Sequence, residues 1–97
     1  MTPETIFMSV LLAMAPDCQP SFPHIIQSSE MLELARPQGD ARGAYLPASN
    51  TIILRDSWDG SWKDNRTLAH EMCHAVQDAC GLPYSEAQCY ELEGEIK

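Results

Sequence analysis

The stretch at residues 67–77, TLAHEMCHAVQ, determines the fold that we expect, because it predicts a helix with two very different faces. His70 and His74 are four residues apart, and Glu71 follows the first histidine. At about 100° per residue, His74 lies about 40° and Glu71 about 100° from His70, so all three share one sector of the helix. Two imidazoles one turn apart can bind the same ion, and zinc takes nitrogen ligands at about 2.0–2.1 Å. The stretch therefore predicts a metal site with a carboxylate beside the ion.

The opposite face of this helix is apolar and is expected to pack in the core, which would hold the histidines rigidly. Its residues are Leu68, Ala69, Met72, Val76 and Ala79. Ser61 or Asp64 can cap the start of the helix, which is expected to run to about Cys80 and to end at Gly81. Pro83 then prevents its continuation.

A catalytic zinc site has three protein ligands and a water molecule, so a third ligand must come from elsewhere in the chain. The candidates are carboxylates downstream of the motif. Ser85 can cap a last helix, which places Glu86 in the first turn. Tyr90 and Glu93 share the face of Glu86, whereas Glu91 points about 140° away.

Two further residues were considered as ligands and set aside. Cys73 lies about 80° from the middle of the histidine pair, on the side away from the motif glutamate, and is assigned to the edge of the core. His24 is distant in sequence and is followed by Ile25 and Ile26, which favours a structural role.

The remaining segments predict a small α+β domain that spans residues 1–97. The apolar segments AYL and TIILR flank four turn residues, which indicates an antiparallel hairpin. This hairpin or small antiparallel sheet is expected to pack on the motif helix and on the helix that follows it. The other predicted elements are a helix at residues 3–15, a short strand at 24–27 and a helical turn at 30–35 capped by Ser28 or Ser29.

The charge balance argues against nucleic-acid and anionic-lipid partners. Six basic residues oppose fourteen acidic ones, which gives a formal net charge of −8. Such a charge repels phosphate backbones and anionic headgroups. The acidic residues are densest at residues 85–97, SEAQCYELEGEIK. A cationic substrate and better solubility are both consistent with this pattern, and solubility is the simpler reason.

The apolar run at residues 6–15, IFMSVLLAMA, is too short to span a bilayer as a helix. No Lys or Arg precedes it, and the first basic residue of the chain is Arg36, so it lacks the charged start of a secretory signal. Thr2 as N-cap and Pro3 at the first helical position indicate the start of a helix. We therefore expect a core helix here and no membrane span.

The four cysteines leave the compartment open. Cys73 and Cys80 lie about 10.5 Å apart along one predicted helix, which is too far for a bond. A Cys80–Cys89 bond would close the loop between the last two helices and would imply an oxidising compartment. Four reduced thiols, including Cys18, are at least as well supported. A cytoplasmic location is therefore favoured, with secretion as the alternative if the cysteines pair.

Together, the HExxH motif at 70–74, the glycine-ended helix and the glutamate on the next helix resemble the gluzincin metallopeptidases. The stretch HEMCHAVQDACGLPYSEA, residues 70–87, is similar to the thermolysin-like version of the pattern. Over about residues 43–93 the chain also resembles small bacterial and phage peptidase domains of the minigluzincin and anti-repressor types. The resemblance implies a zincin-like fold that binds Zn²⁺ through His70, His74 and Glu86.

The same resemblance implies hydrolysis of peptide bonds in a peptide or protein substrate, with Glu71 as the general base. In the thermolysin pattern an Asp that supports a histidine follows the glutamate ligand by four residues, but Tyr90 stands there in this chain. Support for the histidines is therefore expected from elsewhere, for example from a backbone carbonyl. The larger enzymes also have a downstream His or Tyr that stabilises the oxyanion. Tyr84 and Tyr90 are the candidates for this role or for substrate contact.

The strand TIILR is expected to offer an edge to which an extended substrate can add. The missing oxyanion donor suggests an activity that is weak, latent or dependent on a partner chain. Two alternatives stay open. One is a non-catalytic zinc-binding regulatory or interaction module of the same fold, and the other is a metal-free helix whose histidines face solvent. The oligomeric state is left unassigned.

Overall fold

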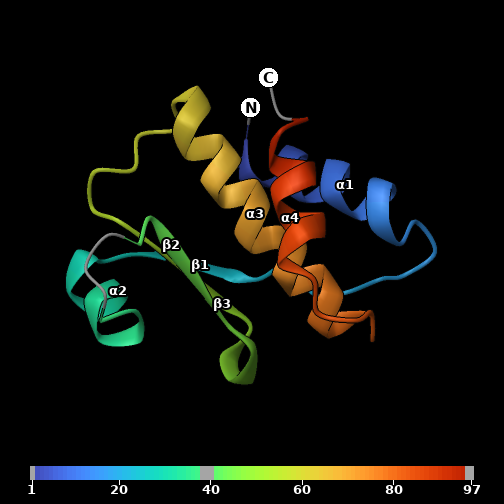
Figure 1. Ribbon diagram of the computed structural model, residues 1–97, viewed down its shortest axis with the longest axis horizontal. Helices are drawn as coiled ribbons and strands as arrows, with labels where there is room; N and C mark the ends of the chain where they lie inside the picture. The colour runs from blue at the N-terminus through green and yellow to red at the C-terminus, as the bar shows by residue number, and fades with distance from the viewer. Residues whose placement is uncertain (1, 38–40, 96–97) are drawn as a thin grey trace.

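The computed structural model of this protein describes residues 2–37 and 41–95, apart from the side chains of Trp62 and Lys63. Over these residues the chain is a small α+β structure in which the long helix α3 lies between a sheet and two other helices (Figure 1). The helical segments are α1 (Pro3–Met14), α2 (Ser29–Ala35), the 3-10 turn η1 (Pro47–Ser49), α3 (Trp62–Ala79) and α4 (Glu86–Glu93). The strands are β1 (His24–Gln27), β2 (Gly43–Leu46) and β3 (Thr51–Leu54).

Helix α3 begins and ends where the sequence predicts. The Ser61 side chain accepts a hydrogen bond from the backbone N–H of Asp64, and Gly81 takes a left-handed conformation with a φ of 68° just beyond the last turn. The predicted apolar face is confirmed for the four residues that are completely buried: Leu68, Ala69, Met72 and Val76. Ala79 is exposed, contrary to the prediction, because Cys80 takes the inward position in the last turn.

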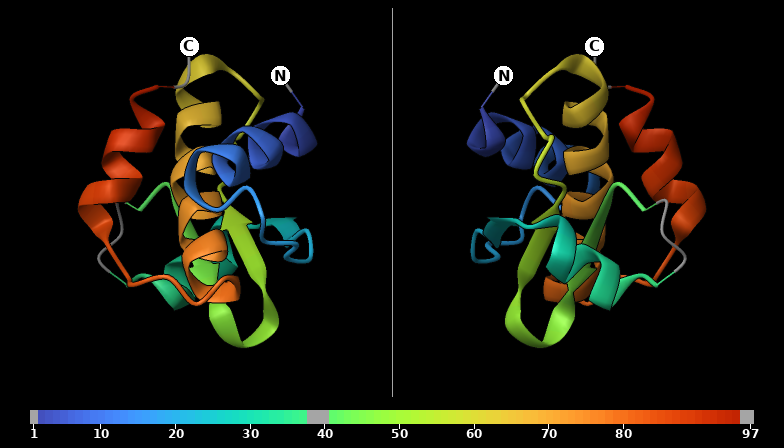
Figure 2. Two further views of the ribbon diagram at one scale, coloured as in Figure 1. Left: turned by 90° about the vertical axis from the view of Figure 1, so that its right-hand side faces the viewer. Right: turned by 90° about the vertical axis from the view of Figure 1, so that its left-hand side faces the viewer.

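Helix α1 confirms the predicted core helix at the start of the chain. Thr2 caps it, and its buried side chains Ile6, Phe7 and Val10 join the core cluster that includes the apolar face of α3. Figure 2 shows α1 crossing α3 while α4 runs along it. In the described parts of the chain, no helix combines the length and the apolar character needed to cross a membrane.

The sheet is mixed, with the strand order β1-β3-β2, rather than antiparallel as predicted. Strands β2 and β3 form the expected antiparallel hairpin, but β1 adds to the other side of β3 in parallel orientation. Strand β3 is therefore central, and the prediction that it offers a free edge is wrong. The connection through α2 and β2 is long enough to allow the parallel pairing.

The two faces of the sheet are covered by different helices. Ile52 and Leu54 of β3 pack in the cluster with α1 and α3, whereas Ile53 packs with Leu32 of α2 and Ala44 of β2. This alternation follows the period of two of a strand. Because β3 is buried on both faces, the sheet forms a fixed support under α3.

The four cysteines form two disulfide bonds, Cys18–Cys80 and Cys73–Cys89, with Cα–Cα distances of 6.1 and 5.5 Å. The two possibilities left open by the sequence, a Cys80–Cys89 bond and four free thiols, are both wrong, whereas the exclusion of a Cys73–Cys80 bond is confirmed. The reason is long-range packing. The segment after α1 brings Cys18 to the end of α3, and α4 runs back along α3 so that Cys89 meets Cys73.

Candidate metal centre

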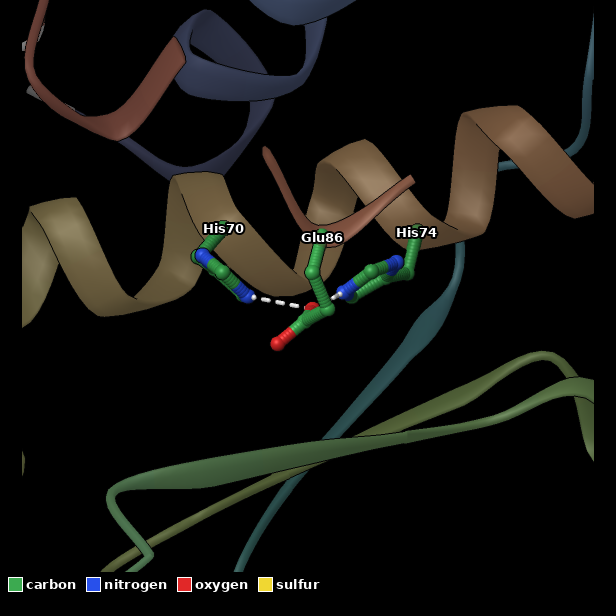
Figure 3. A group of neighbouring side chains, drawn as sticks. All are labelled: His70, His74 and Glu86. Atoms are coloured by element: carbon green, nitrogen blue, oxygen red, sulfur yellow. Dashed lines mark hydrogen bonds and ion pairs between the residues drawn. The ribbon is translucent and has the colours of Figure 1, made fainter. Parts of the chain in front are cut away.

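Two helices bring the three predicted metal ligands together. His70 and His74 project from α3, and Glu86 reaches between their rings from the first turn of α4, above the strands β2 and β3 (Figure 3). Glu86 Oε1 lies 3.0 Å from His70 Nε2 and is also in close contact with His74 Nε2. All three ligand atoms lie within 4.8 Å of one another. The two histidines are buried, whereas the Glu86 side chain is 41% exposed.

A carboxylate on α4 orients the His70 ring. His70 Nδ1 lies 3.0 Å from Glu93 Oε1, which can only accept a hydrogen bond when ionised, so Nδ1 carries the proton. Arg66 Nε donates to the backbone carbonyl of Glu93 at 3.0 Å and ties this end of α4 to α3. The His70 Nε2 lone pair is therefore directed at Glu86.

An amide on α3 orients the His74 ring. Gln77 Nε2 donates to the backbone carbonyl of Ser85 at 3.0 Å and to Gln88 Oε1 at 2.9 Å. A carbonyl can only accept, which fixes the orientation of the amide and turns Gln77 Oε1 towards His74 Nδ1, at 3.0 Å. His74 Nδ1 therefore also carries the proton. Its Nε2 presents a lone pair to the same carboxylate oxygen.

These tautomers make the cluster a good fit for a cation. Two nitrogen lone pairs and a carboxylate oxygen converge, and three acceptors repel one another unless a positive charge lies among them. A proton on one ring or a metal ion supplies that charge. Although partial burial raises the pKa of Glu86, its interactions with His70 and His74 lower it by more, so the pKa of this carboxyl lies below its ordinary value. Two imidazoles and one carboxylate are a donor set that zinc accepts.

Glu71 is the buried carboxylate beside this group. Glu71 is only 5% exposed, and its Oε1 has no hydrogen-bond partner among the described residues. Burial raises the pKa of Glu71 above its ordinary value, against the opposing effect of the His70 and His74 charges. Such an unpartnered oxygen is unusual in a folded protein and is typical of a functional group.

Gly43 allows strand β2 to approach Glu71 closely. A Cβ atom at this position would lie 3.3 Å from Glu71 Cγ, from Thr67 Cγ2 and from the backbone oxygen of Ile53. These contacts are tight for any larger residue. The sheet and α3 therefore enclose the Glu71 side chain between them.

The two candidate tyrosines flank the cluster. The Tyr84 ring stacks on His74, with ring centroids 4.8 Å apart and planes 7° apart. The Tyr90 ring meets His70 edge to face at a centroid distance of 4.6 Å. Both are largely exposed, at 74% and 61%. Desolvation and then the charge of Glu86 raise the pKa of Tyr84, so its phenol remains a hydrogen-bond donor at neutral pH.

Two pockets open on either side of the cluster, and both are lined by Glu71 and Arg36. The larger, of about 350 Å³, includes Arg42. It is further lined by Ala41, Gly43, Thr67, His70, Glu86, Tyr90 and Glu93. The smaller, of about 200 Å³, is further lined by Tyr45, Pro47, His74, Gln77, Asp78, Leu82 and Tyr84. We call them the arginine pocket and the tyrosine pocket.

The structure thus places all six predicted site residues in one region. The residues set aside as ligands lie elsewhere, since His24 is exposed on β1 and Cys73 is bonded to Cys89. Support for the histidines comes from positions other than Tyr90, as expected. It comes from the side chains of Glu93 and Gln77 rather than from the backbone carbonyl given as an example. The helical spacing of three residues between His74 and Gln77 was a signal for the second of these contacts.

Comparisons of the chain with protein-family models, with curated proteins and with solved structures found no match, so the case for a function depends on the geometry above.

Proposed function

We propose that this protein is a zinc-dependent metallopeptidase of the gluzincin type, with a zincin-like fold. The observation that supports the proposal best is the convergence of His70 Nε2, His74 Nε2 and Glu86 Oε1 beside a buried, unpartnered carboxylate. These three residues are the ligand set that the resemblance implies, and the motif by itself predicts the two histidines. Two pockets that meet at the cluster provide room for a chain on both sides of a scissile bond.

Each residue has a distinct role in this proposal. A bound zinc ion would lower the pKa of a water molecule and polarise the peptide carbonyl. Glu71 accepts the proton of the attacking water and passes it to the leaving amine, a role for which its raised pKa suits it. Tyr84, whose phenol remains protonated, donates a hydrogen bond to the oxygen on which negative charge develops. Tyr90 contacts the substrate from the other side of the cluster.

Strand β2, rather than β3, is the edge to which a substrate adds in this proposal. It is at the end of the sheet, and its residues Gly43 and Tyr45 line the two pockets. An extended peptide on this edge would be held by main-chain hydrogen bonds with its backbone beside the cluster. Unfolded segments and loops are therefore the expected substrates.

A Glu71→Gln substitution tests the proposal. The variant keeps the ligand set, so we expect about one equivalent of zinc in both proteins by elemental analysis of untagged material. It lacks the group that moves the proton, so peptide hydrolysis should fall by a factor of at least 10². Glu91→Gln, a matched change at an exposed position of α4, should leave both quantities unchanged.

The outcome also separates the alternatives. Equal hydrolysis by the wild type and the Glu71→Gln variant would contradict the assigned role of Glu71. Bound zinc without hydrolysis of unfolded substrates by the wild type would favour a non-catalytic zinc module. An absence of zinc from the wild type, with no difference from a Glu86→Ala variant, would contradict the metal site itself.

A further inference from the structure

Positive charge is concentrated in the arginine pocket of an otherwise acidic protein. The chain has six basic residues and a formal net charge of −8, yet Arg36 and Arg42 both line this pocket. Both residues are exposed. Within the described residues, neither guanidinium group forms a hydrogen bond or an ion pair. The charge of Arg36 reaches Glu71 and Tyr84, but among the described residues no group accepts from the N–H donors of either arginine, which leaves these donors for a ligand.

The pocket carboxylates do not cancel these charges once a metal is bound. Among the described residues, the acidic ones that line the same pocket are Glu71, Glu86 and Glu93. The first two lie beside the candidate metal site, and Glu93 accepts a hydrogen bond from His70. A divalent cation together with two guanidinium groups exceeds the charge of three carboxylates by one unit. With a metal bound, the described lining of the pocket would therefore be positive, opposite in sign to the whole molecule.

We propose that the arginine pocket binds a carboxylate of the substrate, so that the proposed peptidase prefers an acidic substrate. This inference rests on the proposed function. A guanidinium group presents N–H donors in a planar fork that matches a carboxylate, and such pairs are stronger and more directional than those of an ammonium group. The ligand class is thus a peptide with a carboxylate beside the scissile bond.

The tyrosine pocket has the opposite character. Apart from the shared Arg36, its lining within the described part of the chain includes no Lys or Arg, and Asp78 adds a negative charge. Its walls of Tyr45, Leu82 and Tyr84 suit an apolar or aromatic side chain. A carboxylate therefore belongs in one pocket only, and the two pockets distinguish the two sides of the scissile bond.

The direction of β2 predicts which side carries the carboxylate. Along the chain, β2 passes from Arg42 and Gly43, at the arginine pocket, to Tyr45 and Pro47, at the tyrosine pocket. A substrate strand that adds antiparallel, the more stable pairing, runs the other way. Its C-terminal part then lies in the arginine pocket. The carboxylate is either an acidic side chain that follows the scissile bond or the terminal carboxylate of a short peptide.

Fluorescent peptides that differ by one carboxylate test this inference. One pair has Glu or Gln directly after an aromatic residue, with an amidated C-terminus. In the second pair, Gln after the aromatic residue is the last residue of both peptides. One peptide has a free C-terminal carboxylate and the other is amidated. Binding is measured by fluorescence anisotropy with the zinc-loaded Glu71→Gln variant, which should bind without cleaving. We expect about tenfold tighter binding of the carboxylate member in at least one pair, with a smaller difference at high salt.

The arginine variants test which residues are responsible. Arg36→Gln/Arg42→Gln should lose most of the tenfold difference, whereas Arg36→Lys/Arg42→Lys should keep part of it because the charge remains. Arg55→Gln removes one positive charge from a residue that lines neither pocket, and this variant should keep the whole tenfold difference. Thermal melting and zinc content establish that each variant is folded.

The failure of this inference is distinguishable from the failure of the proposed function. Equal binding of both members of both pairs would overturn the carboxylate site, even if the wild type cleaved all four peptides and so remained a peptidase. A preference for carboxylates without any cleavage by the wild type would support the carboxylate site and contradict the peptidase function. A carboxylate preference that survives in the double Gln variant would also overturn the assignment to these arginines.

Discussion

At the level of single residues, the central feature is the pairing of the two imidazoles. In each ring, Nδ1 is hydrogen-bonded to an acceptor and Nε2 is directed at Glu86. The helical spacing predicted that His70 and His74 point the same way, whereas Glu86 was one of several candidate carboxylates and was singled out by the resemblance to gluzincins. The sequence could not identify the pairing of Glu93 with His70, because that contact depends on how α4 packs along α3. The arginines were also missed, since they flank a loop whose course the sequence does not specify.

Replacement of Gln77 by Ala should weaken zinc binding by about 10–100-fold, the usual range for removing a group that orients a metal-binding histidine. The His74 ring would lose its acceptor, and the backbone carbonyl of Ser85 would lose its donor. Competition with a chromophoric chelator measures the affinity. His24→Ala, which removes the exposed histidine of β1, should leave the affinity unchanged, and an unaltered affinity in Gln77→Ala would contradict the orienting role.

At the level of helices and strands, most boundaries were predictable and the sheet pairing was not. Ser28, Ser61 and Ser85 cap their helices as expected, since a cap is a local interaction. The parallel contact of β1 with β3 joins residues that are far apart in sequence. The run TIIL contained one signal for the central position of β3. A continuous apolar run is typical of a strand that is covered on both faces, and such strands lie in the middle of a sheet.

Gly43→Val should separate zinc binding from hydrolysis. The added side chain would meet Glu71 Cγ and Thr67, so β2 or the Glu71 carboxylate must move. The proposed metal ligands are on α3 and α4, so zinc content should be preserved while kcat/KM falls at least tenfold. Ala48→Val, at an exposed position of η1 in the same hairpin, is the matched control. Full activity in Gly43→Val would show that the close approach of β2 has no role.

For the molecule as a whole, the two disulfide bonds connect α3, through Cys73 and through Cys80 directly after its last residue, to different parts of the fold. Cys18–Cys80 spans 62 residues and holds the segment that follows α1. Cys73–Cys89 spans 16 residues and joins the helix of the two histidines to the helix of Glu86. The sequence excluded one pairing by distance along a helix. It could not choose among the others, because they depend on the packing of distant segments.

The two bonds should differ in what their removal changes. By loop-closure entropy, loss of Cys18–Cys80 should lower the free energy of unfolding by about 4 kcal/mol and loss of Cys73–Cys89 by about 3 kcal/mol. Zinc affinity should show the opposite order, because the shorter loop contains the junction between the ligand helices. Paired Ser variants, studied by denaturant unfolding and by chelator competition, measure both quantities. The same order in both measurements would contradict separate roles for the two bonds.

The pairing of all four cysteines has a practical consequence for metal analysis. Free thiolates are themselves strong zinc ligands. A chain produced in a reducing host carries four of them, with Cys73 on the helix that presents the imidazoles and Cys80 directly after its last residue. Zinc measured in such material would include ions bound by thiolates as well as any ion bound by the histidine pair. The ratio of zinc to protein therefore reports on the candidate site only when both disulfide bonds have formed.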